Sequence, residues 1–186
     1  MKQCMQSFAI ALALFAANPA EAQVEYKVLA TSKTSTMEKE MNEAGAMGFK
    51  FAAVMGGETA VGGKEVVVLM QKGGDATGTF RYKLLATSRT STMQKEMSDA
   101  ALDGYDYVGQ TVFESLFGGE EVVSLVERGA AAESRFVYKL IATSKTSTLQ
   151  KEANEIGKEG YQALGMTVGK TALGGRELVV IARKPK

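Results

Sequence analysis

Three stretches of the chain combine several hydroxyl groups with one basic residue. ATSKTST begins at Ala30, ATSRTST at Ala86 and ATSKTST at Ala142. A helix that begins in such a stretch presents unpaired backbone N–H groups and the positive end of its dipole, and the side chains add donors and charge. This chemistry suits a phosphate, a sulfate, a carboxylate or an acidic sugar. The predicted anion-binding residues are Lys33, Thr34, Ser35, Arg89, Thr90, Ser91, Lys145, Thr146 and Ser147.

A structural role explains the same residues. Ser35, Ser91 and Ser147 each precede a Glu or Gln by three residues, which is the pattern of a capping box with Ser as the N-cap. Such a cap stabilises a helix by about 1 kcal/mol. One cap needs one hydroxyl, whereas each stretch supplies several, so the anion hypothesis stays open beside the capping role.

Residues 1–22 have the features of a secretory signal peptide. Lys2 gives a positive start, Phe8 to Ala17 form a short apolar run, and Ala20-Glu21-Ala22 is a small-x-small cleavage pattern. The apolar run is too short to span a bilayer as a stable helix. We therefore predict a signal peptide at 1–22, a mature chain from Gln23, and a location in the periplasm or outside the cell.

Charge and composition limit the possible functions of the mature chain. The net charge is +1, and removing residues 1–22 leaves it unchanged because they contain one base, Lys2, and one acid, Glu21. We therefore expect no nucleic acid partner and no membrane span. The chain has no His, and its one cysteine is Cys4. Without Cys and His, the mature chain cannot form a disulfide, a thiolate or imidazole metal site, or a Ser-His-Asp triad. We expect no metal, no cofactor and no catalytic residue.

Each hydroxyl-rich stretch belongs to a longer repeat in which the elements follow the order strand, helix, strand, strand. In the first repeat, a strand at 26–31 precedes a helix that ends at Gly48, and an aromatic residue, Phe49, then opens the second strand. Gly62-Gly63 predicts a hairpin turn into the third strand. Tyr26, Tyr82 and Tyr138 open the repeats and are expected to cover a sheet edge. The predicted boundaries are 23–72, 81–128 and 137–186 for the repeats and 73–80 and 129–136 for the linkers.

The third strand of each repeat is apolar on both faces. In the first repeat, Val67 and Leu69 point one way while Val66, Val68 and Met70 point the other. The helix covers only one face, so another layer must cover the second. We therefore predict an α+β fold of three tandem βαββ repeats, each with one helix and a small antiparallel or mixed three-stranded sheet whose third strand lies in the middle. The sheet faces are expected to meet around an approximate threefold axis.

The end of each predicted helix resembles a family of small bacterial domains of unknown function. The segments are NEAGAMGFKFAAV, SDAALDGYDYVGQ and NEIGKEGYQALGM, and each is followed by a strand that ends in a basic residue, as in LMQK, LVER and IARK. The resemblance implies a βαββ unit in which the helix ends in Gly plus an aromatic residue. It implies no activity.

Three functional hypotheses follow. The first is a noncatalytic binding or scaffold protein with an unknown envelope or extracellular partner, which includes the possibility of a homo-oligomer. The second is anion or acidic-glycan binding at the three helix N-termini. The third is a carboxylate-dependent hydrolase of envelope material, although the sequence gathers no cluster of Asp or Glu that would support it.

Overall fold

The computed structural model describes residues 23–59, 63–73, 78–114, 120–130, 133–171 and 173–186. The predicted signal peptide and Gly62 of the predicted hairpin turn lie outside the described residues. Unit 1 contains β1 (Glu25–Thr31), α1 (Thr34–Ala46), β2 (Lys50–Thr59) and β3 (Gly63–Lys72). Unit 2 contains β4 (Phe80–Thr87), α2 (Thr90–Leu102), β5 (Asp106–Glu114) and β6 (Glu120–Gly129). Unit 3 contains β7 (Phe136–Thr143), α3 (Thr146–Lys158), β8 (Gln162–Lys170) and β9 (Arg176–Pro185).

Each unit forms one three-stranded sheet with its last strand in the middle. The orders are β1-β3-β2, β4-β6-β5 and β7-β9-β8, and both outer strands run antiparallel to the central one. The first and second strands of a unit are therefore parallel to each other, because the helix between them reverses the chain. This confirms the predicted α+β fold of three repeated units. Among the described residues, no helix has the length and hydropathy that crossing a bilayer requires.

The helices end as the sequence predicts. Gly48 has φ +89°, a left-handed backbone conformation that favours glycine, and Gly104 and Gly160 repeat it. The Gly48 N–H donates to the Gly45 carbonyl and the Phe49 N–H donates to the Ala44 carbonyl, which is the bonding pattern of a Schellman motif. The repeated pair of a glycine and an aromatic residue therefore fixes where each helix ends and turns the aromatic side chain toward the core.

The helices do not begin as the capping-box pattern predicts. The N-cap positions are held by Lys33, Arg89 and Lys145, and none makes a side-chain capping bond. Ser35 thus lies inside the first turn of α1, and its prediction as the N-cap is wrong. The chain is instead turned into the helix by Thr31, whose hydroxyl accepts a hydrogen bond from the Lys33 N–H at 3.2 Å. This local bond competes with a side-chain cap and moves the helix start toward the N-terminus.

The three units share their hydrophobic cores with their neighbours. We call the sheet face covered by a unit's own helix the helix face, and the opposite one the far face. Met37, Met41 and Val68 on the helix face of unit 1 pack in one cluster with Val123 and Leu125 from the far face of unit 2. The helix face of unit 2 receives Tyr138 and Ile181 of unit 3 in the same way. The predicted second layer is therefore the helix face of the preceding unit.

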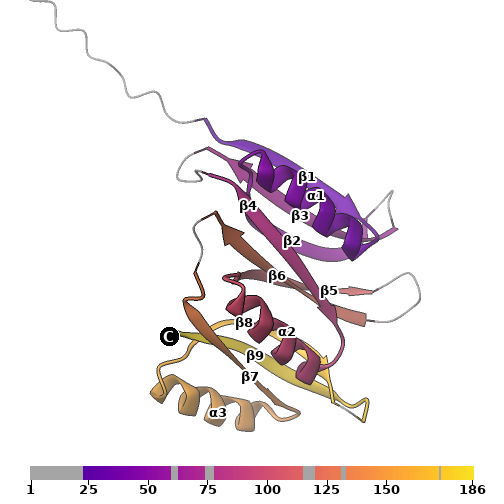
Figure 1. Ribbon diagram of the computed structural model, residues 1–186. Coiled ribbons are helices and arrows are strands. Elements are labelled where there is room, and N and C mark those ends of the chain that lie inside the picture. The colour runs from indigo at the N-terminus through magenta and orange to yellow at the C-terminus, as the bar shows by residue number, and fades with distance from the viewer. Residues whose placement is uncertain (1–22, 60–62, 74–77, 115–119, 131–132, 172) are drawn as a thin grey trace, which may run out of the picture.

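This packing places the units in a row, as Figure 1 shows. The expected meeting of three sheet faces around a threefold axis is therefore wrong. Within the part of the chain that the structure describes, the clusters that cross between units join unit 1 to unit 2 and unit 2 to unit 3. The physical reason is that each far face packs on the helix face of the preceding unit, and the movement from one unit to the next does not close the three units into a ring.

Tyr82 and Tyr138 lie inside the junctions between units and do not cover sheet edges. Tyr82 is 2% exposed, and its hydroxyl accepts a hydrogen bond from the Phe51 N–H at 2.9 Å and donates to Glu127 at 2.9 Å. The Tyr138 hydroxyl accepts from the Tyr107 N–H at 2.8 Å. In both cases a register shift in the partner strand leaves the N–H available to the tyrosine. Burial, with Glu127 nearby, raises the pKa of the Tyr82 phenol far above its usual value.

Replacing Tyr82 with Phe is expected to lower the free energy of unfolding by about 1–3 kcal/mol, because the Phe51 N–H is left buried without a partner. Tyr26→Phe is the matched control, since Tyr26 occupies the same place in unit 1 but is 60% exposed. It should change stability by less than about 0.5 kcal/mol. Urea denaturation of both variants measures the difference, and equal effects would show that the hydroxyl of Tyr82 does not hold the junction.

Candidate functional site

The predicted anion-binding residues lie at the first turns of α1, α2 and α3. Their basic members, Lys33, Arg89 and Lys145, are all exposed. Each first turn belongs to a different unit of the row, so the structure does not gather the three stretches into one site (Figure 1). Whether any of them holds an anion stays a prediction.

The middle stretch is engaged by unit 3. The Thr90 hydroxyl donates to the Glu177 carboxylate at 2.5 Å, and the Lys170 N–H donates to the Ser88 carbonyl at 2.8 Å. A Cβ on Gly169 would lie 2.4 Å from the Thr90 hydroxyl oxygen, so this approach requires a glycine. The N-terminus of α2 therefore already has a carboxylate beside it, supplied by the protein itself.

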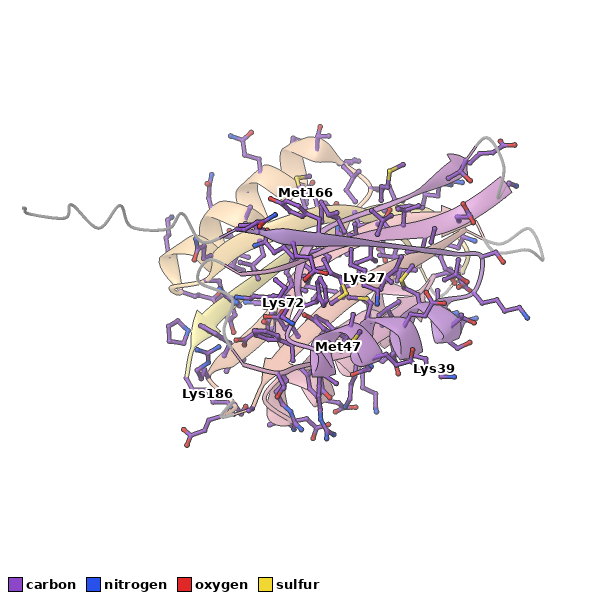
Figure 2. The ribbon with its side chains drawn as sticks, turned by 90° about the horizontal axis from the view of Figure 1, so that it is seen from above. Lys27, Lys39, Met47, Lys72, Met166 and Lys186 are labelled. Atoms are coloured by element: carbon purple, nitrogen blue, oxygen red, sulfur yellow. The ribbon has the colours of Figure 1, made fainter. Side chains whose placement is uncertain are left out.

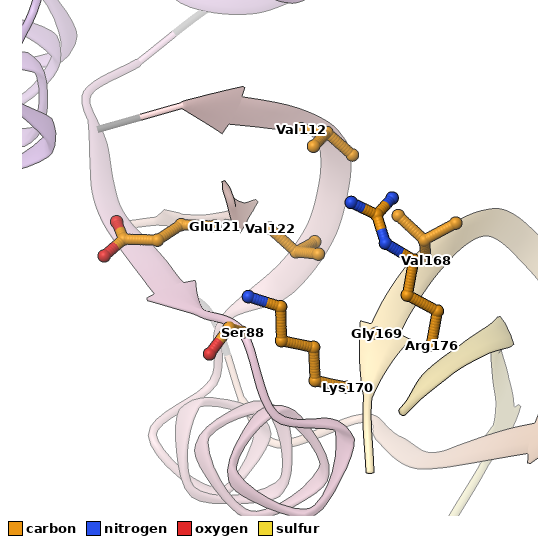
Figure 3. A pocket seen from close by; sticks show the side chains of 8 residues that line it. All are labelled: Ser88, Val112, Glu121, Val122, Val168, Gly169, Lys170 and Arg176. Carbon is orange, nitrogen blue, oxygen red and sulfur yellow. The ribbon is translucent and has the colours of Figure 1, made fainter. Parts of the chain in front are cut away.

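The same junction contains a small cavity. Figure 3 shows its lining side chains, with Lys170 and Arg176 of unit 3 reaching toward unit 2 and the Glu121 carboxylate pointing away from both. The cavity volume is about 10 Å³, which is close to the space one water molecule needs. It is far too small for an organic ligand, so it is a feature of the junction.

The residues predicted to complete the capping boxes bind the next unit instead. The Glu38 carboxylate accepts a hydrogen bond from the Leu84 N–H at 2.8 Å, and the Gln94 amide oxygen accepts from the Leu140 N–H at 2.7 Å. Asn42 donates to the Tyr82 carbonyl and accepts from the Tyr82 N–H. These helix side chains occupy the outer edges of β4 and β7. A Glu or Gln recurs at this position in every unit, which is a pattern that could have indicated the contact between units. The capping-box interpretation instead predicts a bond to the backbone of the same helix.

The two ends of the row carry the same features without a neighbour. The far face of unit 1, which we call the head face, exposes Tyr26 by 60%, Val28 by 64% and Met55 by 55%. Its counterparts in unit 2 and unit 3 are the buried far faces described above. The residues of the head face are Val24, Tyr26, Val28, Ala30, Ala53, Met55, Val67 and Leu69.

The opposite end is the helix face of unit 3, which we call the tail face. Gln150 and Asn154 stand where Glu38 and Asn42 stand in unit 1, and both are exposed. Met166 is also exposed. The residues of the tail face are Gln150, Asn154, Gly157, Ala163 and Met166. The sequence predicts that another layer covers the sheet face opposite the helix. It does not predict that this face would stay exposed in unit 1.

The carboxyl groups do not form a catalytic cluster in the part of the chain that is described. Burial raises the pKa of Glu96 on α2 and of Glu127 on β6. Glu127 is already bonded to Tyr82 and paired with Lys50 at 3.8 Å across the junction. No group of three or more His, Cys, Asp or Glu side chains among the described residues is placed to hold a metal ion. This arrangement does not favour the hydrolase hypothesis.

Comparison with known proteins identifies no relative: no protein-family model, no curated protein and no solved structure matches this chain. The resemblance to a family of small bacterial domains therefore stays a prediction.

Replacing Gln94 with Ala is expected to lower the free energy of unfolding by about 1–3 kcal/mol, because the Leu140 N–H loses its partner inside a junction. The control is Gln150→Ala, which removes the same side chain from the exposed tail face and should change stability by less than about 0.5 kcal/mol. Both are measured by urea denaturation of dilute protein. Equal losses would mean that residues at this position stabilise their own helix and not the contact between units.

Proposed function

We propose that the mature chain is a noncatalytic extracytoplasmic protein that acts as a binding or scaffold module through its end faces. The observation that carries this proposal is the exposed head face of unit 1. Tyr26, Val28 and Met55 are more than half exposed, whereas the corresponding far-face strands in the other two units are buried by a neighbour. A contiguous apolar face on a soluble domain is characteristic of an interaction surface.

The repeated polar residues also support a structural role over a catalytic one. Thr90 bonds Glu177, Glu38 bonds the Leu84 backbone, and Gln94 bonds the Leu140 backbone. Each of these bonds joins one unit to the next. These polar side chains are thus used to assemble the units.

The predicted location fits this proposal. A signal peptide at 1–22 would deliver the chain to the periplasm or the exterior, and cleavage after Ala22 would leave every residue of the head face in the mature protein. The partner would then be an envelope or extracellular component with an apolar surface, or another copy of the chain.

Site-specific photo-crosslinking in the native host tests this function. Val28 is replaced by the photoreactive residue p-benzoylphenylalanine, and the envelope fraction is irradiated. We expect covalent adducts because Val28 is 64% exposed on the head face. Leu102, which is 68% exposed at the end of α2, is the matched control position and should give none. Absence of adducts at Val28, or equal adducts at both positions, would overturn the proposal.

A second candidate function is anion or acidic-glycan binding at the helix starts. The observation in its favour is that none of the three helices has a side-chain cap, while an exposed basic residue stands at each N-cap position. The first-turn N–H groups can therefore donate to an external anion. Because Glu177 already contacts Thr90, α1 and α3 are the better candidates for such binding.

Titration of the mature protein with inorganic phosphate tests this alternative. If anions bind, the amide NMR signals of Thr34, Ser35, Thr146 and Ser147 should shift and saturate. The triple variant Lys33→Gln, Arg89→Gln, Lys145→Gln should lose these shifts and keep its melting temperature, because the three basic side chains are exposed. Identical shifts in the variant, or no saturation in the wild type, would exclude anion binding at these residues.

A further inference from the structure

We infer that the head face binds the tail face of a second copy of this chain, so that copies associate head to tail and continue the row of units. This inference rests on the proposed function and names its partner. Its basis is that the chain already contains two examples of the interface, between units 1 and 2 and between units 2 and 3. The head face and the tail face are the two kinds of surface that meet at each of these interfaces.

The head face has the backbone register of the strands that occupy the internal junctions. Tyr26 lies opposite Gln71 in the sheet of unit 1, as Tyr82 lies opposite Glu127 and Tyr138 opposite Arg183. The outer edge of β1 therefore presents the same main-chain groups as the outer edges of β4 and β7. In those two strands the groups are bonded by helix side chains of the preceding unit.

The tail face supplies the partners for these groups. Gln150 corresponds to Glu38 and Gln94, so it is placed to accept from the Val28 N–H. Asn154 has the position and the side chain of Asn42, whose amide bonds the Tyr82 main chain at the first junction. The register of β8 shifts between Ala163 and Gly165, at the same place as in β2 and β5. The Ala163 N–H is thereby positioned for the Tyr26 hydroxyl.

Side-chain sizes at the end faces are complementary. In the first junction Phe51 packs against Gly109, where a Cβ would lie 2.8 Å from the ring. In the second, Tyr107 packs against Gly165, where a Cβ would lie 2.6 Å from the hydroxyl. The corresponding residues at the ends are Ala163 on the tail face and Ala53 on the head face. The glycine becomes an alanine in the one unit whose facing residue is also small, so the pair fits without a clash.

The residues at the two ends that correspond to the charged pair of the first junction are also compatible with each other. Lys50 of unit 1 pairs with Glu127 of unit 2, and in the next junction the signs are reversed, because Asp106 of unit 2 pairs with Arg135 of unit 3. The residues at the ends that correspond to Lys50 and Glu127 are Gln162 and Gln71. Two neutral amides there bury no unpaired charge and can bond to each other. None of these matches is required if the end faces only contact water.

The geometry favours open growth. The contact joins two different surfaces, so it is heterologous, and an assembly in which the rotation does not close keeps a free head and a free tail. Figure 2 looks down the row from unit 1 and shows α1, which contains Lys39 and ends before Met47, on the opposite side of the molecule from α3. Successive units are thus rotated about the row as well as displaced along it. Repetition of this movement builds a twisted filament.

The experiment measures molar mass by size-exclusion chromatography with light scattering over a wide range of concentrations of the mature chain. The wild type should form species larger than a dimer whose mass falls on dilution. Val28→Glu blocks the head face at an exposed side chain. Gly157→Glu blocks the tail face where nothing lies within 4 Å, although a Cβ on its counterpart Gly45 would lie 2.4 Å from the Phe80 carbonyl oxygen of the next unit. Each variant alone should be monomeric.

An equimolar mixture of the two blocked variants should form a one-to-one dimer and nothing larger, because one copy offers only a tail and the other only a head. Leu102→Glu is the control for adding a charge at an exposed apolar site and should assemble like the wild type. Circular dichroism melts verify that all variants are folded.

A wild type that stays monomeric at every concentration would overturn the inference, as would a Gly157→Glu variant that assembles by itself through head-to-head contacts. If the wild type is monomeric while Val28 crosslinks to a different protein in the host envelope, the proposed binding function stands and self-association fails. If Val28 gives no crosslink and the protein is monomeric, both are wrong.

Discussion

The units hold together mainly because each buries its far sheet face against the helix face of the preceding unit. A unit of this size has a small core, and the described residues contain no cysteine that could add a disulfide. Met37 and Met41 on the helix and Val123 and Leu125 on the neighbouring sheet are all fully or almost fully buried, and each such side chain contributes about 1.5–3 kcal/mol through removal from water. Neither surface would be covered without its neighbour, so folding and stacking of the units are parts of one process.

Polar contacts fix how the units stack. The Tyr82 hydroxyl fits the bulge in β2, while Glu38 and Asn42 bond the exposed edge of β4. An open strand edge is prone to pair with foreign strands, and helix side chains that occupy it remove that hazard while defining a single register. Apolar faces alone would tolerate sliding. The hydrogen bonds across the junction specify one arrangement, because any other leaves buried donors unpaired.

Repeat proteins of this type are quasi-one-dimensional, and their terminal units usually carry polar outer faces that stop further stacking. Here unit 1 ends in Tyr26 and Val28, both exposed, and unit 3 ends in Gln150 and Asn154, which reproduce the connectors of the internal junctions. In the described part of the chain, the head face has no polar cap, so it is available for the binding that we propose. The same contact that builds the chain from three units is available to join one chain to the next.

The amino-acid pattern was enough to place the helix ends and to order the strands of each sheet, although it misplaced the helix starts. The helix ends at Gly48 because only glycine adopts that φ readily, the hairpins place the third strand in the middle, and the two apolar faces of that strand require a second layer. Only the packing of the units established which groups form hydrogen bonds across the junctions. Glu38 was assigned to its own helix, but its partner is Leu84, 46 residues away, and Tyr82 lies inside a junction that no local pattern predicts. Three equivalent units allow both a ring and a row, and the choice depends on whether the rotation from one unit to the next closes on itself, which is a property of packing between distant segments.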